Sequence, residues 1–188
     1  MKVKMGQTPG LLRFILVPEE NDILEPNENV SLGSKEIEIH LPWQLDPDTI
    51  HPDHLALCIM MITHPFVGKS LTFPKPVSQR FGDRHNSSAS RYSIGPVDEE
   101  LEPWSPSENS RPGLAFSGGV DSTAALALMP PTTAPIFMDR PIRKKSLYDK
   151  DAVHYSCLEV ERLGYDMHVI SCDLEYVRSP VGFPVDVA

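Results

Sequence analysis

The residues best suited to chemistry form one short run, Ser117-Gly118-Gly119-Val120-Asp121-Ser122. Two adjacent glycines permit positive φ angles and leave room for a ligand to approach the backbone. Successive backbone N–H groups in such a turn can point at one anion, and a helix that follows the turn adds its positive end. Ser117, Ser122 and Thr123 supply hydroxyl groups at the same place. The run therefore predicts a cradle for phosphate.

Asp121 refines this prediction. A carboxylate beside bound phosphates would repel them unless a divalent cation lies between, and Mg²⁺ commonly bridges carboxylates and phosphates. The run thus favours a magnesium–polyphosphate over bare phosphate, with Asp121 as the metal ligand. The alternative is an ordinary strand-to-helix turn in which Asp121 is only a helix-start residue.

The elements expected around this run alternate between strand and helix. Their ranges are 113–116, 120–129, 134–138, 146–163 and 167–170. The order β-α-β-α-β implies a parallel sheet with right-handed crossovers. It also places the run at the carboxyl end of a strand, where open α/β sheets bind their ligands.

The second expected helix has its own local signals. Ser146 with Asp149 three residues later resembles a capping box, which predicts that the helix begins there. Val153, Cys157 and Val160 share one face at helical spacing, and this face is expected to be buried.

The run Ser117-Gly118-Gly119-Val120-Asp121-Ser122 resembles the SGGxDS signature of the PP-loop, or N-type, ATP pyrophosphatases. The resemblance covers about residues 113–175. The group includes GMP synthetase, NAD synthetase, asparagine synthetase, tRNA-thiolating enzymes and the 7-cyano-7-deazaguanine synthases. It implies a Rossmann-like α/β fold of the adenine nucleotide alpha hydrolase type. It also implies a ligase or synthase that cleaves ATP to AMP and pyrophosphate. The AMP moiety activates a carbonyl or carboxylate oxygen, and a nitrogen or sulfur nucleophile then displaces it.

The resemblance implies roles for particular residues. Asp121 and Ser117 would be catalytic, and Asp121 would hold Mg²⁺. The residues expected to bind the β,γ-pyrophosphate of ATP, with their immediate neighbours in the turn, are Ser117, Gly118, Gly119, Val120, Asp121, Ser122 and Thr123. ATP and Mg²⁺ are then the expected cofactors, and the acceptor is a small molecule that the sequence does not identify.

Asp139-Arg140 closes the second expected strand, which in this family ends near the adenosine. Asp139 could meet the ribose or the metal and Arg140 the α-phosphate, while a solvated turn before Pro141 is the alternative. The cluster Arg143-Lys144-Lys145 could neutralise phosphate or belong to a solvated loop.

Residues after the third expected strand are candidates for the second substrate's pocket. Asp173, Glu175 and Arg178 could face that substrate, and the tail 179–184 could line its pocket.

Two features depart from the family. Its sheet normally has about five strands with the first in the interior, whereas three are visible here, and their expected order 3-2-1 leaves the first at an unprotected edge. We therefore expect either a truncated piece of a longer enzyme or a chain completed by a partner or oligomer. The four-cysteine zinc site of the deazaguanine synthases is absent from this sequence, so that member is not indicated.

The rest of the chain reads as a smaller module. Residues 1–85 predict an irregular α+β module with strands at 11–17 and 36–41 and a helix at 49–63. Residues 86–112 predict a Pro/Ser-rich linker, and 113–188 the amino-terminal part of the ATP-binding domain. Proline is frequent, at 19 of 188 residues, which favours irregular stretches.

Composition narrows the function classes. The formal net charge of −9 disfavours nucleic-acid binding through bulk electrostatics. Three cysteines without a CxxC pair disfavour a disulfide framework or a four-cysteine zinc site. No signal peptide is recognisable, and the longest apolar run, 55–62, is too short to span a bilayer. We expect a soluble cytoplasmic protein without a membrane partner.

Three other patterns could be mistaken for sites. Gly68-Lys69-Ser70 looks like the end of a Walker A motif but lacks the earlier glycine and the following helix. The histidines at 51, 54 and 64 lack a convincing set of further metal ligands. Cys157 and Cys172 are better explained as core thiols than as a sulfur relay.

A competing function of another class is a non-catalytic nucleotide-binding or assembly module. The incomplete sheet favours that alternative, and the intact hydroxyls with Asp121 disfavour it. A fragment that no longer folds alone is a third possibility.

Overall fold

A computed structural model describes residues 1–28, 30–41, 44, 46–88, 90–141 and 149–180 of the chain. The strands are β1 (Lys2–Thr8), β2 (Leu11–Val17), β3 (Val30–Leu32), β4 (Glu36–His40), β5 (Ser70–Ser78), β6 (Ser93–Asp98), β7 (Gly113–Ala115), β8 (Ala134–Asp139), β9 (His168–Cys172) and β10 (Arg178–Pro180). The helices are α1 (Pro52–Thr63), α2 (Gln79–Ser87), α3 (Val120–Leu128) and α4 (Lys150–Arg162), with 3₁₀ turns at Pro47–Thr49 and Leu174–Tyr176.

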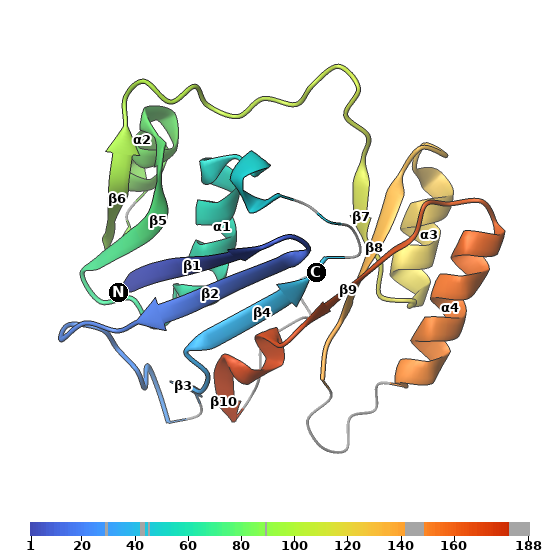
Figure 1. Ribbon diagram of the computed structural model, residues 1–188. Coiled ribbons are helices and arrows are strands. Elements are labelled where there is room, and N and C mark those ends of the chain that lie inside the picture. The colour runs from blue at the N-terminus through green and yellow to red at the C-terminus, as the bar shows by residue number, and fades with distance from the viewer. Residues whose placement is uncertain (29, 42–43, 45, 89, 142–148, 181–188) are drawn as a thin grey trace.

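One sheet runs through the whole α/β fold. Its eight strands follow the order β6-β5-β1-β2-β4-β9-β8-β7, and β10 pairs with β3 in a separate two-stranded sheet (Figure 1). Both flanks of the large sheet are parallel: β6, β5 and β1 on one side, and β9, β8 and β7 on the other. Strands β1, β2, β4 and β9 are joined by antiparallel pairs in the centre. The order β9-β8-β7 puts β7 at an edge, as predicted.

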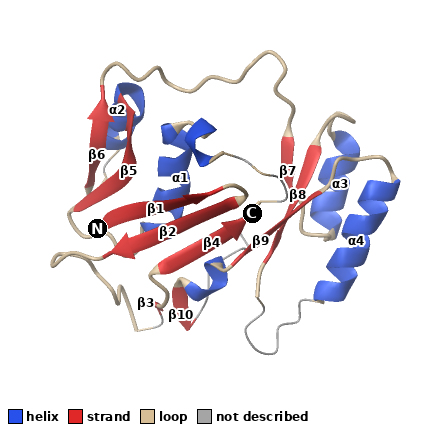
Figure 2. Cartoon of the chain, viewed as in Figure 1, coloured by secondary structure: helices blue, strands red, loops and turns tan. Residues whose placement is uncertain are grey.

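The carboxyl-terminal flank is the part that positions the candidate loop. The chain passes β7-α3-β8-α4-β9, and both helices lie on the same side of these strands (Figures 1 and 2). The apolar faces of the elements meet in one small core. Its buried members are Phe116, Leu126, Phe137, Val153, Cys157, Val160 and Met167. The predicted buried face of the second helix, with Val153, Cys157 and Val160, is thus confirmed.

The expectation of only three strands is wrong, although β7 does lie at an edge of the sheet. β4 pairs with β9 in antiparallel fashion, with Ile39 opposite Cys172 and His40 opposite Ser171. This pairing joins the flank to strands of the first 85 residues. The β4–β9 pairing could not be predicted from the sequence, because the two strands lie far apart in the chain and no local pattern indicates which strands pair. The division into module, linker and ATP-binding domain stays a prediction.

The larger core is built mainly from the first half of the chain. Met1, Val3, Phe14 and Ile37 are almost completely buried in it, and α1 contributes Leu55, Ala56, Ile59 and Ile62. Cys172, the last residue of β9, and Leu174 and Val177 beyond it complete this core. The two ends of the sequence therefore share one hydrophobic core.

The expected linker contains a strand. Residues 93–98 form β6, which pairs in parallel with β5, whereas 99–112 hold neither helix nor strand. That connection runs from one edge of the sheet to the other (Figure 1). The prolines in these segments, including Pro74 and Pro76 of β5, led to a prediction of irregular structure where the chain forms strands. The β5–β6 register shifts between Thr72 and Val77, so the prolines fall where the ladder is interrupted.

The helix starts also differ from prediction. α1 begins at Pro52, and the His51 side chain caps it by accepting a hydrogen bond from the Asp53 N–H. α4 begins at Lys150 with Asp149 as its cap, not as the third residue of a box begun by Ser146. Ser146 lies outside the described residues. Asp149 caps the helix because its carboxylate accepts hydrogen bonds from the N–H groups of both Asp151 and Ala152, at 3.1 Å each.

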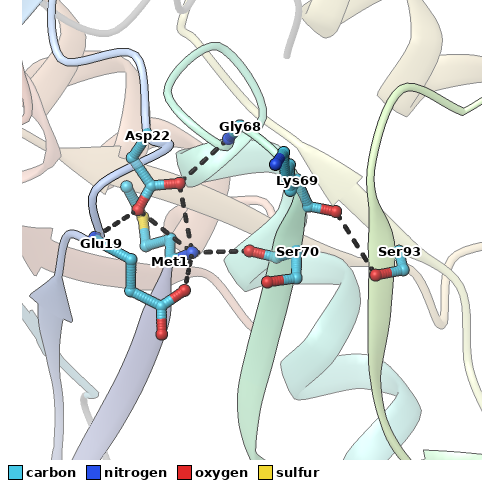
Figure 3. Close-up of polar contacts among 7 residues, drawn as sticks. All are labelled: Met1, Glu19, Asp22, Gly68, Lys69, Ser70 and Ser93. Atoms are coloured by element: carbon cyan, nitrogen blue, oxygen red, sulfur yellow. Dashed lines mark hydrogen bonds and ion pairs between the residues drawn. The ribbon is translucent and has the colours of Figure 1, made fainter.

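The apparent Walker residues belong to a structural junction at the amino terminus (Figure 3). The Met1 ammonium lies 3.0 Å from the Glu19 carboxylate and 3.1 Å from that of Asp22, and it donates to the Ser70 carbonyl at 2.6 Å. The Gly68 N–H donates to Asp22 at 3.0 Å.

Close packing explains the glycine of this junction. A Cβ atom at Gly68 would lie 1.7 Å from the backbone oxygen of Asn21, so any other residue would displace the chain. The Lys69 carbonyl accepts from the Ser93 N–H at 2.9 Å, which ties β5 to β6. The segment thus has a packing role. Within the described part of the chain, every helix falls short of the length and apolar character needed to cross a bilayer.

Candidate functional site

Residues 117–122, called the glycine loop below, connect the edge strand β7 to α3. Gly118 has φ of 75°, the left-handed conformation that glycine adopts most readily. Gly119, with φ of −80° and ψ of 168°, is the residue that precedes the first turn of α3. The backbone N–H groups of the first turn of α3 point out from the helix end, and Gly119 has no side chain to accept from them. An anion can therefore bind there.

The two glycines differ in their surroundings. A Cβ atom at Gly118 would lie 3.2 Å from Val153 Cγ1 and 3.4 Å from Ser156 Cβ, both on α4. A Cβ atom at Gly119 would come no closer than 3.4 Å to its nearest neighbour, Ser117 Oγ. Gly118 is therefore needed for the fold of the loop, whereas the space beside Gly119 is open to a ligand.

The hydroxyl groups of the loop converge. Ser117 Oγ and Ser122 Oγ lie 3.2 Å apart, and the Ser122 hydroxyl also donates to the Gly119 carbonyl at 3.0 Å. The Thr123 hydroxyl donates to the same carbonyl at 2.9 Å. The structure thus brings together Ser117 and Ser122, as the sequence predicted, while Thr123 stabilises the start of the helix.

The remaining residues of the loop are on the surface. Asp121 is exposed in the first turn of α3, and the Val120 side chain is 82% exposed beside it. An exposed carboxylate one residue into the helix can reach a cation held by phosphates at the loop. Val120 offers only its backbone to such a ligand.

Asp139 ends β8 and lies in a cluster that the sequence reading missed. The Lys150 ammonium lies 2.5 Å from Asp139 Oδ1, and His154 Nε2 lies 3.8 Å from Oδ2. Lys150 and His154 are one helical turn apart on α4. The i, i+4 spacing of Lys150 and His154, after a strand that ends in Asp139, could have indicated this cluster. The helix was expected to begin at 146, which obscured the spacing.

Arg140 and Glu175, predicted separately, form one ion pair. Their side chains are 22% and 17% exposed, and Arg140 Nη1 donates to Glu175 Oε2 at 3.0 Å. Asp173 accepts a hydrogen bond from the Glu38 N–H at 2.7 Å. Burial raises the pKa of Asp173 above its ordinary value, and these contacts join the ends of β8 and β9 to β4.

Other predicted residues fall outside this cluster. The Nε atom of Arg178 is buried, and its N–H group donates no hydrogen bond to the described residues. The basic cluster 143–145 and residues 181–184 of the tail lie outside the described part of the chain.

The histidines and cysteines serve the fold. His51 caps α1 and its Nε2 lies 3.0 Å from the Glu102 carbonyl oxygen, while the His54 ring lies 4.4 Å from that of Trp104. Cys157 and Cys172 are free, buried thiols, and burial raises the pKa of both. Such thiols are protonated and poorly nucleophilic at neutral pH.

No family model, curated protein or solved structure matches the chain. The candidate site is therefore defined by its own geometry: a glycine turn with converging hydroxyls at the carboxyl edge of parallel strands.

Proposed function

We propose that this protein binds Mg·ATP at the glycine loop and uses it to form an adenylate, as the PP-loop ATP pyrophosphatases do. The observation that carries the proposal is the loop itself. Left-handed Gly118, the uncapped first turn of α3, and the Ser117 and Ser122 hydroxyls 3.2 Å apart bring several donor groups together in one short turn. Such a set is complementary to the oxygens of a polyphosphate.

The finer fold assignment belongs to the same proposal. The order β7-α3-β8-α4-β9, with parallel strands and both helices on one side, supports a Rossmann-like unit of the adenine nucleotide alpha hydrolase type. The loop then lies after the first strand of that unit, at the carboxyl edge of the sheet, which is where α/β folds bind nucleotides.

Asp121 supports magnesium as the partner of the phosphates. Its carboxylate is the acidic side chain in the first turn of α3 and would repel a bare polyphosphate. With Mg²⁺ between them, the carboxylate becomes a ligand instead. Ser117 and Ser122 would then donate to the β,γ-pyrophosphate, and Asp121 would hold the metal.

The chemistry follows from this arrangement. An oxygen of the acceptor's carbonyl or carboxylate attacks the α-phosphorus of ATP, and the bond from that phosphorus to the α,β-bridging oxygen breaks. Pyrophosphate would leave with its charge held by the glycine loop, and a Mg²⁺ ion held by Asp121 would supply further charge stabilisation there. A nitrogen or sulfur nucleophile then attacks the activated carbon and displaces AMP. The loop's part is to stabilise charge on the leaving group.

The acceptor is not identified, so the metal requirement is the sharpest first test. Isothermal titration with pyrophosphate, with and without Mg²⁺, should show that the metal strengthens binding by the wild-type chain. In Asp121→Asn this magnesium effect should fall by about tenfold, the loss of one charged ligand interaction. Glu108→Gln, an exposed carboxylate far along the 99–112 connection, is the matched control. An unchanged magnesium effect in Asp121→Asn would remove Asp121 from the site.

A further inference from the structure

Three elements meet beside the glycine loop. The parallel register of β7 and β8 places Ala115 opposite Ile136, so the glycine loop follows β7 at the same edge of the sheet at which β8 ends with Asp139. On the helical side, Gly118 packs against Val153 and Ser156 of α4. The end of β8 and the first turns of α4 are thereby fixed against the loop.

Two basic side chains of α4 approach the carboxylate at this junction. Lys150 and His154, which flank Val153 on the helix, both approach Asp139, at 2.5 Å and 3.8 Å. The edge of the His154 ring also packs against Phe137, with centroids 5.9 Å apart. Val153 touches the loop while its helical neighbours hold Asp139, so the cluster and the loop are adjacent.

The hydrogen bonding of this cluster is incomplete. Asp139 Oδ1 and His154 Nε2 are buried atoms without a hydrogen bond from the described residues. Oδ1 is held by the ion pair with the Lys150 ammonium at 2.5 Å, so His154 Nε2 is the atom of this cluster that lacks a close polar partner among the described residues. Buried polar atoms are normally paired, and exceptions are often completed by an ion, water or ligand.

We propose that Lys150 is a phosphate-binding residue on the α4 side of the same site, and that Asp139 is a positioning residue that holds its ammonium. The inference rests on the proposed function of the glycine loop. Lys150 is a compact charge on a flexible stem, and its side chain is 35% exposed, so its ammonium can turn toward a bound phosphate. Asp139 retains His154 as a second partner when it does so.

Charge explains why the site needs this residue. The glycine loop contributes the negative Asp121 and no positive side chain. Among the described residues, Arg140, another predicted cation, is held by Glu175 in a more buried pair. A polyphosphate beside Asp121 would gain from a further cation, and Lys150 lies one helical turn before Val153, which packs against the loop.

The test is calorimetric titration of the full chain with Mg·pyrophosphate. Lys150→Gln should weaken binding by about tenfold or more, the value of one charge-assisted hydrogen bond, whereas Lys150→Arg should recover most of the affinity. Lys75→Gln is the matched control, because Lys75 also forms a close pair with an aspartate, Asp48 at 2.7 Å, on another part of the molecule. Circular dichroism and thermal melting confirm that each variant is folded.

The positioning role of Asp139 has its own readout. Asp139→Asn should weaken pyrophosphate binding in the wild-type chain and have no further effect in the Lys150→Gln background, since it acts through Lys150. Equal losses in both backgrounds would overturn that role. If folded Lys150→Gln binds with wild-type affinity while the separate variant Gly119→Val does not bind, the inference is overturned and the proposed function stands. Failure of the folded wild-type chain to bind Mg·pyrophosphate would overturn both.

Discussion

At the scale of single residues, the two neighbouring glycines of the loop have separate tasks. Gly118 adopts φ of 75° with α4 packed against it, so it serves the backbone. Gly119 has an ordinary φ of −80° and open space beside it, so the proposed ligand can approach the backbone there. This separation lets folding and binding be tested independently.

We expect Gly118→Ala to lower the free energy of unfolding by about 1–3 kcal/mol, because alanine resists positive φ and its Cβ would crowd Val153. Gly119→Ala is the control in the same loop and should change stability by less than about 1 kcal/mol, since its φ suits alanine. Urea denaturation of the two variants measures both values. Equal destabilisation would contradict the assignment of tasks.

Residue types could be predicted from the sequence, but their partners could not. Glycines, hydroxyls and an aspartate in one short run predict a phosphate cradle, because the chemistry is local to the run. The contact of Lys150 with Asp139 crosses from helix to strand, and the Arg140–Glu175 pair joins two strand ends. Contacts of this kind depend on how the helices and strands pack, and the spacing of residues in a single sequence does not reveal that packing.

At the scale of elements, α4 links the fold to the candidate site. Its cap Asp149 fixes where the helix begins, and thereby which residues face the end of β8. Its buried face packs in the small core beneath the glycine loop. A weaker start of α4 should loosen Lys150 first, because it is the helix's first residue.

Asp149→Ala should therefore lower the free energy of unfolding by about 1 kcal/mol, the usual cost of removing a capping side chain. The carboxylate accepts from two backbone N–H groups that would lose this partner. Glu161→Ala, an exposed change near the other end of the helix, should have a smaller effect. Thermal unfolding of both variants decides the matter, and equal melting temperatures for Asp149→Ala and wild type would argue against the cap.

Elements with a strong local pattern were predictable. Strand β2 matches its predicted range, and β4, β7, β8, α3 and β9 differ from theirs only at the ends, because alternating or continuous apolar residues between turn signals specify them. Strands β5 and β6 contain Pro74, Pro76 and Pro96 and were read as irregular. Tertiary pairing overrides the proline signal there, since β6 is an edge strand and the β5 ladder is interrupted.

At the scale of the whole molecule, one sheet and a shared core connect the two halves of the chain. The β4–β9 pair joins them through the backbone, and Val177, fully buried, joins them through the larger core. Because both halves of the chain contribute to the larger core, loss of either half would disrupt it, and we expect the chain to unfold cooperatively.

Calorimetry should accordingly show a single thermal transition. Val177→Ala should lower its midpoint, with a loss of about 2 kcal/mol for the methyl groups removed from a packed core. Val169→Ala removes the same atoms from a side chain that is 39% exposed and should cost clearly less. Two separate transitions, with only one moved by Val177→Ala, would show that the halves unfold independently.

The central claim is that the glycine loop binds the polyphosphate of ATP, and titration of Mg·ATP into wild-type and Gly119→Val chains tests it most directly. The valine side chain would fill the open space beside Gly119 without requiring positive φ, so the variant should remain folded. We predict that the wild-type chain binds Mg·ATP and that folded Gly119→Val does not. Equal binding by both chains, or no binding by the folded wild type, would contradict the account.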